Sequence, residues 1–347
     1  MRNKREIKIG NLIVGGKNPI VIQSMTNTKT SDVENTVLQI KELEKAGCQI
    51  VRVTVPDLKT AEDIYKIKER INIPLVADIH FDYRIALACI EQGVDKIRIN
   101  PGNIGDRKNI KLIADAAKNK KIPIRIGVNS GSVDKSILEK YGEVSADAMV
   151  ESALNEIKLL EECDFEDIVI SIKASDVRKT VDAYRKIDKL INYPLHIGVT
   201  EAGSEYSGLV KSSVGLGSLL LDDIGDTIRV SLTADPVKEI FAAKEILKAS
   251  GLMKSGVEIV SCPTCGRCNY NLIEIVNKLE EKVKNINKSV KVAVMGCVVN
   301  GPGEAKDADM GIAGGLNECV FFKKGELVEK IPFDNVVDYL LKEIKNY

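Results

Sequence analysis

Short β-rich runs alternate with amphipathic helical segments along the first 235 residues of the chain. Eight runs are rich in β-branched residues, as buried parallel strands are. They cover residues 21–25, 50–55, 75–79, 96–100, 124–128, 168–173, 195–200 and 228–232. Helical spacing of apolar residues occurs between them, as at 32–46, 60–70 and 83–92. Eight β/α repeats in about 250 residues predict a (β/α)8 TIM barrel. An open doubly wound sheet is the alternative, but no G-x-G-x-x-G turn follows the first strand.

A second pattern begins near residue 256. Strands are expected at 257–261, 290–295, 310–313 and 320–322, and helices at 272–284 and 335–345. The sequence therefore predicts an α/β protein with two domains. Residues 1–250 form the barrel, residues 256–347 form a smaller α+β domain, and residues 249–256 link them.

Composition limits the possible partners. Lys+Arg and Asp+Glu both number 50, aromatic residues make up 4% of the chain, and tryptophan is absent. These features argue against a nucleic-acid partner. No apolar run has the length of a membrane span, and no apolar segment follows the basic N-terminus as in a signal peptide. We expect a cytoplasmic protein whose cysteines stay reduced.

Cations recur toward the ends of the predicted strands, where a TIM barrel has its active site. They are Arg52, Arg98, Arg125, Lys173 and Arg229. Five converging cations imply an anionic ligand such as a diphosphate. The alternative is that they form buried ion pairs with Asp78, Asp82, Glu201 and Asp235.

Uncharged and titratable polar residues end the same strands. They are His80, Asn100, Asn129, Thr200, Glu201 and Ser231. Each can bind a substrate hydroxyl or transfer a proton. His196 stands early in its strand, far from the expected mouth, and is predicted to be structural.

Four cysteines of the second domain indicate a metal site. Cys262, Cys265 and Cys268 are spaced C-x-x-C-x-x-C, and Cys297 follows in a Gly/Pro-rich loop. Structural zinc and an iron–sulfur cluster fit this spacing equally well, with Glu304 able to complete either set. A thioredoxin-like redox pair would leave Cys297 unexplained. The remaining cysteines are predicted to be core or strand residues; they are Cys48, Cys89, Cys163 and Cys319.

Long motifs resemble one family from about residue 6 to about residue 345. They include QSMTNT at 23–28, ADIHFDYR at 77–84, RINPGNIG at 98–105, KASD at 173–176, TEAG at 200–203, CPTC at 262–265 and GCVVNGPGEA at 296–305. The chain resembles the bacterial two-domain 4-hydroxy-3-methylbut-2-enyl diphosphate synthases of the methylerythritol phosphate route to isoprenoids. No extra inserted domain of the plant type is present.

The resemblance implies a [4Fe–4S] cluster held by Cys262, Cys265, Cys297 and Glu304. It implies reductive ring opening and dehydration of 2-C-methyl-D-erythritol 2,4-cyclodiphosphate, with Glu201 and His80 near the reacting carbons and the five cations, Asn129 and Ser231 on the diphosphate. Ferredoxin or flavodoxin would supply the electrons. A homodimer is expected in which each cluster domain caps the partner's barrel.

Two questions remain open at this level. Cys268 adds a thiol where the family has no ligand, and we interpret it as a neighbour because Glu304 keeps the family spacing from Cys297. A zinc-stabilised barrel that binds or hydrolyses a phosphorylated metabolite is the rival function. A non-enzymatic phosphate-binding module fits less well, because it would not need Asn100, Thr200 and Glu201.

Overall fold

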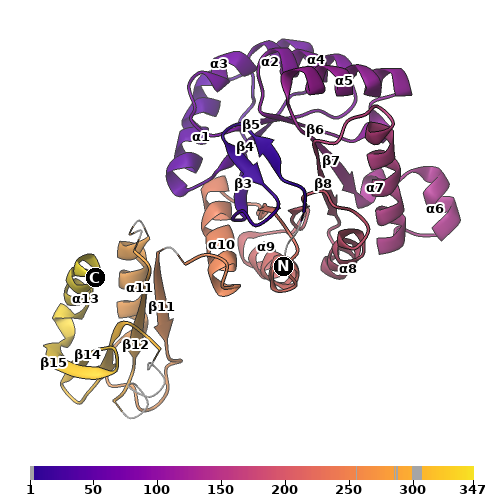
Figure 1. Cartoon of the computed structure of the whole chain (residues 1–347). Coiled ribbons are helices and arrows are strands. Elements are labelled where there is room, and N and C mark those ends of the chain that lie inside the picture. Colours follow the sequence, from indigo (N-terminus) through magenta and orange to yellow (C-terminus); the bar gives the residue numbers. More distant parts are fainter. Residues whose placement is uncertain (1–3, 255, 285, 287, 299–306) are drawn as a thin grey trace. The chain divides into compact units, whose positions relative to one another are not determined.

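A computed structural model describes residues 4–254, 256–284, 286, 288–298 and 307–347. The chain divides into two compact units, residues 1–252 and 253–347, each of which is described by itself (Figure 1). The first unit is a ring of parallel strands surrounded by helices. No helix in the described ranges has both the length and the apolar character needed to cross a membrane.

The ring has eight strands in the hydrogen-bonded order β8-β7-β6-β5-β4-β3-β10-β9. They are β3 (Val21–Met25), β4 (Ile50–Thr54), β5 (Leu75–Asp78), β6 (Lys96–Ile99), β7 (Ile124–Asn129), β8 (Ile168–Lys173), β9 (His196–Ile197) and β10 (Thr227–Ile228). A parallel bridge between Ile170 and Leu195 joins the two ends, and the Ile170 N–H donates to the Pro194 carbonyl at 2.9 Å. The predicted TIM barrel is therefore confirmed, and the open sheet is excluded.

Helices surround these strands, and most begin at an aspartate or serine that caps the first turn. They are α1 (Val33–Ala46), α2 (Leu58–Glu62), α3 (Ile64–Lys68), α4 (Tyr83–Glu91), α5 (Arg107–Lys120), α6 (Lys135–Tyr141), α7 (Ala146–Glu161), α8 (Val177–Asp188), α9 (Glu205–Leu221) and α10 (Pro236–Ala249). The single helix predicted at 60–70 is wrong. Asp57 accepts the Thr60 N–H at 2.8 Å and starts α2 early, and the chain breaks at Asp63 before α3.

A hairpin that the sequence pattern did not predict precedes the barrel. Its strands, β1 (Ile7–Ile9) and β2 (Leu12–Val14), have only three residues each, too few to show periodicity. Ile7, Ile9 and Val14 pack with Val21 and Ile50 at the N-terminal ends of the barrel strands. This apolar plug closes one end of the ring, so the polar interior opens at the other end.

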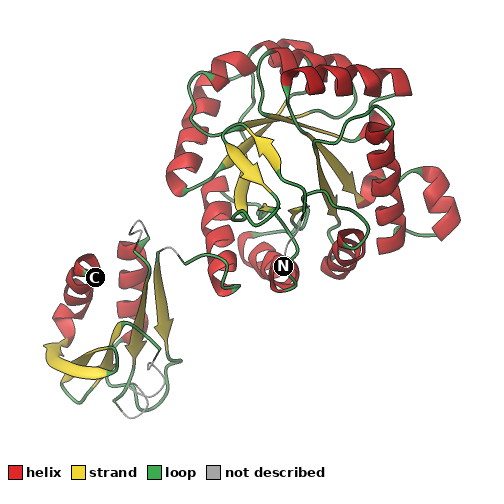
Figure 2. Ribbon diagram, in the orientation of Figure 1, coloured by secondary structure: helices red, strands yellow, loops and turns green. Residues whose placement is uncertain are grey.

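The second unit is a five-stranded sheet in the order β11-β12-β13-β14-β15 (Figure 2). The strands are β11 (Val257–Ser261), β12 (Val290–Met295), β13 (Met310–Gly314), β14 (Glu318–Lys323) and β15 (Glu326–Pro332), and the helices are α11 (Leu272–Val283) and α13 (Val336–Asn346). The first three strands are parallel, and the last two pair antiparallel. The sequence missed β15, because this edge strand is almost wholly exposed and lacks apolar alternation.

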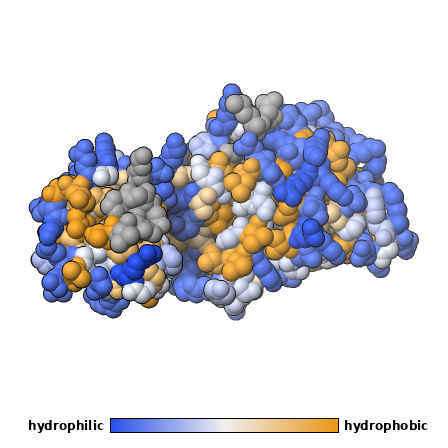
Figure 3. Space-filling model, turned by 90° about the horizontal axis from the view of Figure 1, so that it is seen from below, coloured by the Kyte–Doolittle hydropathy of each residue, from blue (hydrophilic) through white to orange (hydrophobic). Residues whose placement is uncertain are grey.

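The barrel exposes an apolar stripe on its outer surface. Tyr206, Val210 and Val214 of α9 are spaced by about one helical turn, Leu221 lies two turns further on, and all four are exposed. Figure 3 views the molecule from below the orientation of Figure 1 and shows apolar groups between hydrophilic ones on that face. Only two charged residues, Glu205 and Lys211, interrupt the seventeen residues of α9.

Candidate active site

The barrel interior holds the five predicted cations close together. Arg98 and Arg125 are register partners on neighbouring strands, and Lys173 ends β8 opposite Asn129. Arg52 lies on β4, and Arg229 directly follows β10. Four of the five are more than nine-tenths buried, and Arg229 is half-buried. Such burial of like charges is unfavourable unless a counter-charge reaches them.

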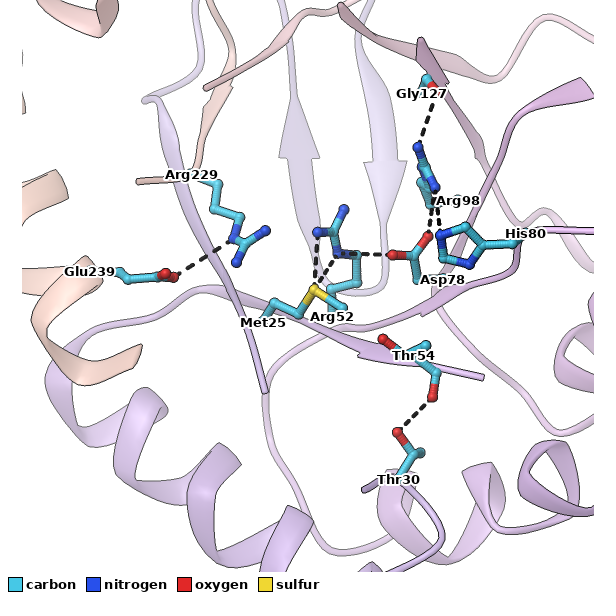
Figure 4. Close-up of polar contacts among 10 residues, drawn as sticks. All are labelled: Met25, Thr30, Arg52, Thr54, Asp78, His80, Arg98, Gly127, Arg229 and Glu239. Atoms are coloured by element: carbon cyan, nitrogen blue, oxygen red, sulfur yellow. Dashed lines mark hydrogen bonds and ion pairs between the residues drawn. The ribbon is translucent and has the colours of Figure 1, made fainter. Parts of the chain in front are cut away.

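Asp78 is the counter-ion of two of these cations (Figure 4). Its carboxylate lies 3.1 Å from Arg98 Nη1 and 3.6 Å from Arg52 Nε. Burial alone would raise the pKa of Asp78, but Arg52 and Arg98 overcome this effect and lower that pKa to about 2. Asp78 is therefore ionised at neutral pH and fixes both guanidinium groups.

Glu239 of α10 is a second buried counter-ion, which the sequence reasoning missed. Its Oε2 lies 3.7 Å from Arg229 Nε and accepts the Ser24 hydroxyl at 3.0 Å. Its Oε1 accepts the Leu232 N–H at 3.0 Å. The sequence offered one signal for Glu239, namely an acidic residue in the first turn of a helix. Acidic residues are common there at exposed positions, so this signal does not predict a buried counter-ion.

The other predicted counter-ions serve elsewhere. Asp82 pairs with Arg84 at the start of α4, and Asp235 caps α10 by accepting the Val237 N–H at 2.8 Å. Among the described residues Glu201 forms no ion pair within 4.0 Å. The predicted ion pairs are thus right for Arg52 and Arg98, which share Asp78, whereas Arg229 pairs with Glu239, a partner that was not predicted. For Arg125 and Lys173 no ion pair is found among the described residues.

Arg125 and Lys173 are buried and have no carboxylate partner among the residues that the structure describes. Arg125 Nε and Nη1 find no hydrogen-bond acceptor within the described part of the chain. Burial, together with the neighbouring arginines, lowers the pKa of Arg125 and the pKa of Lys173. Lys96, which the sequence reasoning did not single out, is fully buried on β6, and its pKa is lowered in the same way. Among the described residues only two carboxylates, Asp78 and Glu239, pair with the five predicted cations, so this group is short of counter-charge even before Lys96 is added.

Two glycines make room for these side chains. A Cβ at Gly127 would lie 2.4 Å from Arg98 Nε, and a Cβ at Gly198 would lie 2.6 Å from Lys173 Nζ. Arg98 Nη2 also donates to the Gly127 carbonyl at 3.0 Å. Glycine inside a strand marks a close approach of this kind, so this signal was present in the sequence.

The mouth contains a pocket of about 260 Å³. It is lined by His80, Arg98, Asn100, Asn103, Asn129, Ser130, Gly131, Ser132, Thr200 and Glu201. Six of these are predicted site residues, and Ser231, which is half-buried after β10, is not among them. The pocket is therefore lined both by one of the buried cations, Arg98, and by the polar and titratable side chains predicted for the site.

Backbone geometry marks Glu201 within this pocket. Glu201 has φ 50°, in the left-handed region that a non-glycine residue rarely adopts. Such strain clusters at functional sites. His80 Nε2 lies 3.5 Å from Arg98 Nη1, so its ring also faces the cations. His196, by contrast, is fully buried at the start of β9, with Nδ1 2.7 Å from Thr227 Oγ1.

The cysteines of the second unit lie at the C-terminal ends of β11 and β12, which are paired in parallel. Cys262 and Cys297 directly follow these ends and are half-buried, and Cys265 is exposed. Hydrogen bonds from the backbone and side chain of Arg267 lower the pKa of Cys265. Glu304 lies outside the described residues.

The arrangement suits an iron–sulfur group, although no three potential ligands among the described residues are yet within metal-binding reach of one another. The Gly296 N–H donates to Cys262 Sγ at 3.1 Å, as backbone groups do to cluster sulfurs. The candidate metal-ligating groups are cysteine thiols, which are the ligands that iron–sulfur clusters use. Burial raises the pKa values of Cys48, Cys89 and Cys319 to about 12, consistent with inert core thiols.

Comparison with known proteins agrees with this architecture. Residues 4–244 match the GcpE TIM-barrel domain, and residues 258–346 match the GcpE protein C-terminal domain. A protein of Ruminiclostridium cellulolyticum is 59% identical over 98% of this chain and 96% of its own length, and one of Fusobacterium nucleatum is 58% identical over 99% and 97%. Both relatives are named 4-hydroxy-3-methylbut-2-en-1-yl diphosphate synthase (flavodoxin).

Solved structures show likeness in the barrel fold alone. N-acetylneuraminic acid synthetase of Leptospira borgpetersenii aligns with a TM-score of 0.51 at 15% identity, covering 72% of this chain and 90% of that one. Dihydropteroate synthase of Yersinia pestis aligns with a TM-score of 0.51 at 10% identity, covering 71% and 98%.

Fold and site together define a TIM-barrel protein with a cation-rich mouth and a separate thiol-bearing α+β domain. Matches to both of the family's domains cover nearly the whole chain. The chain belongs to the GcpE family.

Proposed function

We propose that this protein converts 2-C-methyl-D-erythritol 2,4-cyclodiphosphate into 4-hydroxy-3-methylbut-2-enyl diphosphate, a step of isoprenoid precursor synthesis. The reaction opens the ring at a carbon–oxygen bond and removes a hydroxyl group as water, consuming two electrons and two protons. One observation carries the proposal: five cations gather in the barrel mouth and, among the described residues, pair with only two carboxylates, so a diphosphate would supply the missing negative charge.

The described residues suggest how the substrate is held. We assign the diphosphate to the buried cations, with Asn129 and Ser231 as further donors; the cations are Arg52, Arg98, Arg125, Lys173 and Arg229. Asn100 and Thr200 line the pocket and would bind substrate hydroxyls. Fixed charges in a water-poor site orient the substrate without reorganisation during the reaction.

Glu201 and His80 are the candidate proton donors. Both line the pocket, and Glu201 is held in a strained backbone conformation while His80 lies beside Arg98. A carboxyl or an imidazolium group within reach of the departing hydroxyl would protonate it as it leaves. We give Glu201 this role because its strained backbone fixes the direction of its side chain.

The smaller domain would hold the redox group. In this proposal residues 1–250 bind the substrate, and residues 256–347 hold a [4Fe–4S] cluster through Cys262, Cys265, Cys297 and Glu304. When bound, such a cluster supplies electrons singly, and flavodoxin or ferredoxin replenishes them. The relatives' names specify flavodoxin, which favours that donor.

We extend the proposal to a cytoplasmic homodimer in which each cluster domain covers the partner's barrel mouth. The exposed apolar stripe of α9 supports an association of two copies, because contiguous apolar surface marks interaction sites. Sedimentation measurements test it: a dimer is expected for the unaltered chain, and a monomer at micromolar concentration would contradict it.

Anaerobic purification tests the activity. We expect a brown protein that contains iron and turns over the cyclodiphosphate when reduced flavodoxin is supplied. Cys297→Ser should lose most of the iron and the activity, whereas the matched variant Cys163→Ser, altered in the barrel, should keep both. Colourless protein containing zinc would favour the rival zinc-stabilised barrel and overturn the proposal.

A further inference from the structure

Cys268 is the thiol of the cysteine turn that the proposed function leaves without a role. Its N–H donates to the Cys265 carbonyl at 3.0 Å, so the chain reverses between these two residues. The reversal leaves Cys265 exposed and turns Cys268 inward, where its S–H donates to the Tyr270 carbonyl at 3.2 Å. Cys268 therefore belongs to the interior side of the turn.

Gly296 shows how near Cys268 lies to Cys262. The three heavy atoms nearest to a Cβ built at Gly296 are Cys268 Sγ at 2.9 Å, Cys268 Cβ at 3.2 Å and Cys262 Sγ at 3.5 Å. The Gly296 N–H also binds Cys262 Sγ. The sulfur atoms of Cys262 and Cys268 thus both lie next to the space where a Cβ of residue 296 would be, and a side chain at this position would come between them.

Tyr270 gives an independent indication of the same grouping. Burial raises the pKa of Tyr270, and the thiols of Cys319, Cys268, Cys262 and Cys297 raise it further. The thiols around Tyr270 therefore include both Cys268 and Cys262.

We infer that Cys262 and Cys268 form a disulfide when the protein carries no cluster. In part this inference rests on the proposed function, which makes Cys262 a cluster ligand. Both sulfurs lie over Gly296, so side-chain rotations bring them together without separating β11 from β12. The pair gives up two electrons and two protons to a small-molecule disulfide such as oxidised glutathione, which leaves as two thiols.

The disulfide has a consequence for cluster assembly. It occupies a proposed ligand in a reversible form and so protects Cys262 from irreversible oxidation to sulfinic acid. A cluster can then be rebuilt only after a thiol has reduced the bond. Cys268 acts as a resolving thiol in this scheme, and Cys265 and Cys297 remain free.

Trypsin separates the possible pairings. Cleavage after Lys254, Arg267 and Lys278 places Cys262 and Cys265 on peptide 255–267 and Cys268 on peptide 268–278. Full-length protein is freed of iron with a chelator, oxidised with glutathione disulfide, alkylated, digested and analysed by mass spectrometry. We expect the two peptides to be cross-linked, with alkylated Cys265 in the fragment spectrum.

Variants complete the test. Cys268→Ser should abolish the cross-linked peptide and allow iron and sulfide to be reinserted without prior reduction, whereas Cys265→Ser should keep the cross-link. A Cys262–Cys265 or Cys265–Cys268 bond, a stable glutathione adduct, or free thiols throughout would overturn the inference. If the protein binds iron but does not form this disulfide once the cluster is removed, the inference is refuted and the proposed function stands. If the disulfide forms but the protein never binds iron, the proposed function is refuted and the inference of the disulfide stands.

Discussion

The barrel mouth and the cysteine end of the smaller domain organise their functional groups in opposite ways. Mouth residues are mostly buried on adjacent strands, with positions set by sheet register and by ion pairs to Asp78 and Glu239. The cysteines lie on turns beyond strand ends, and Cys265 is exposed. The barrel thus has its cations placed before any ligand arrives, whereas the thiols are gathered by turns that a ligand can still draw together.

This difference predicts where each region is vulnerable. Buried charge makes the mouth sensitive to the loss of a counter-ion and tolerant of the loss of an unpaired cation. The thiol site carries little buried charge, so changes there should affect metal content and redox behaviour more than stability. The following substitutions test the mouth side of the comparison.

Asp78→Asn should have the largest effect. It leaves Arg52 and Arg98 buried without their counter-ion, and loss of one partner from a buried pair costs about 3–5 kcal/mol. Urea unfolding measures the difference. The matched control Asp82→Asn removes a carboxylate four residues away that caps α4 near the surface, and it should change stability little, because asparagine also caps helices.

The pH dependence of the Asp78 effect has a defined sign. The pKa of Asp78 is about 2, below its ordinary value, so its stabilisation is present above pH 4 and is lost as the pH falls toward 2. The gap in unfolding free energy between the unaltered chain and Asp78→Asn should therefore shrink over that range. A gap of constant size would show that Asp78 is not held as an ion pair.

Arg125→Met should separate binding from stability. If Arg125 meets the diphosphate as proposed, loss of this buried charge costs about 2–5 kcal/mol, equivalent to a KM higher by about 30- to 4,000-fold. The unliganded protein should be as stable as before or more stable, because no carboxylate among the described residues would be left unpaired when Arg125 is replaced. An unchanged KM would remove Arg125 from the site, and a strongly destabilised protein would show that Arg125 has a structural partner.

The sequence predicted the barrel well because its eight strands are strongly β-branched and its charged positions fall at strand ends. It could not predict the pairing of Arg229 with Glu239, because an acidic residue in the first turn of α10 resembles an ordinary surface residue. It also could not show that Cys268 turns inward while Cys265 turns outward, because C-x-x-C spacing does not specify side-chain direction. Strands of three residues, such as β1 and β2, are too short to show the alternation of apolar and polar residues by which a strand is predicted.

Gly198→Ala should have a smaller effect. The added methyl group would lie 2.6 Å from Lys173 Nζ and 2.7 Å from the Arg229 carbonyl, and overpacking of this kind costs about 1–3 kcal/mol. We expect a raised KM as Lys173 is displaced. The same substitution at Gly217, which faces open space on α9, should stabilise by up to about 1 kcal/mol. Equal effects at both glycines would contradict a spatial role for Gly198.

Glu156→Gln should have the smallest effect at neutral pH, and it tests why the buried cations are short of counter-charge. Glu156 of α7 lies behind Asn100: a Cβ at Gly102 would be 3.3 Å from Asn100 Oδ1 and 3.7 Å from Glu156 Oε1. Burial raises the pKa of Glu156 to about 8, although Arg98 acts against this effect. The carboxyl is therefore neutral at pH 7 and does not compensate the cations.

The sign of this last effect follows from linkage. The unfolded chain releases the Glu156 proton near pH 4.5 and the folded chain near pH 8, so stability falls as the pH rises between these values. Glutamine has no proton to lose, so the stability of Glu156→Gln relative to the unaltered chain should rise by about 4 kcal/mol between pH 4 and pH 8. Its amide is itself buried with little hydrogen bonding, and this costs about 1–3 kcal/mol at every pH, so only a small net gain is expected at pH 7. Thermal unfolding at both pH values measures the gain, with exposed Glu139→Gln as control. An effect at pH 4 equal to that at pH 8 would mean that Glu156 is ionised in the fold and that a further carboxylate, besides Asp78 and Glu239, already compensates the buried cations.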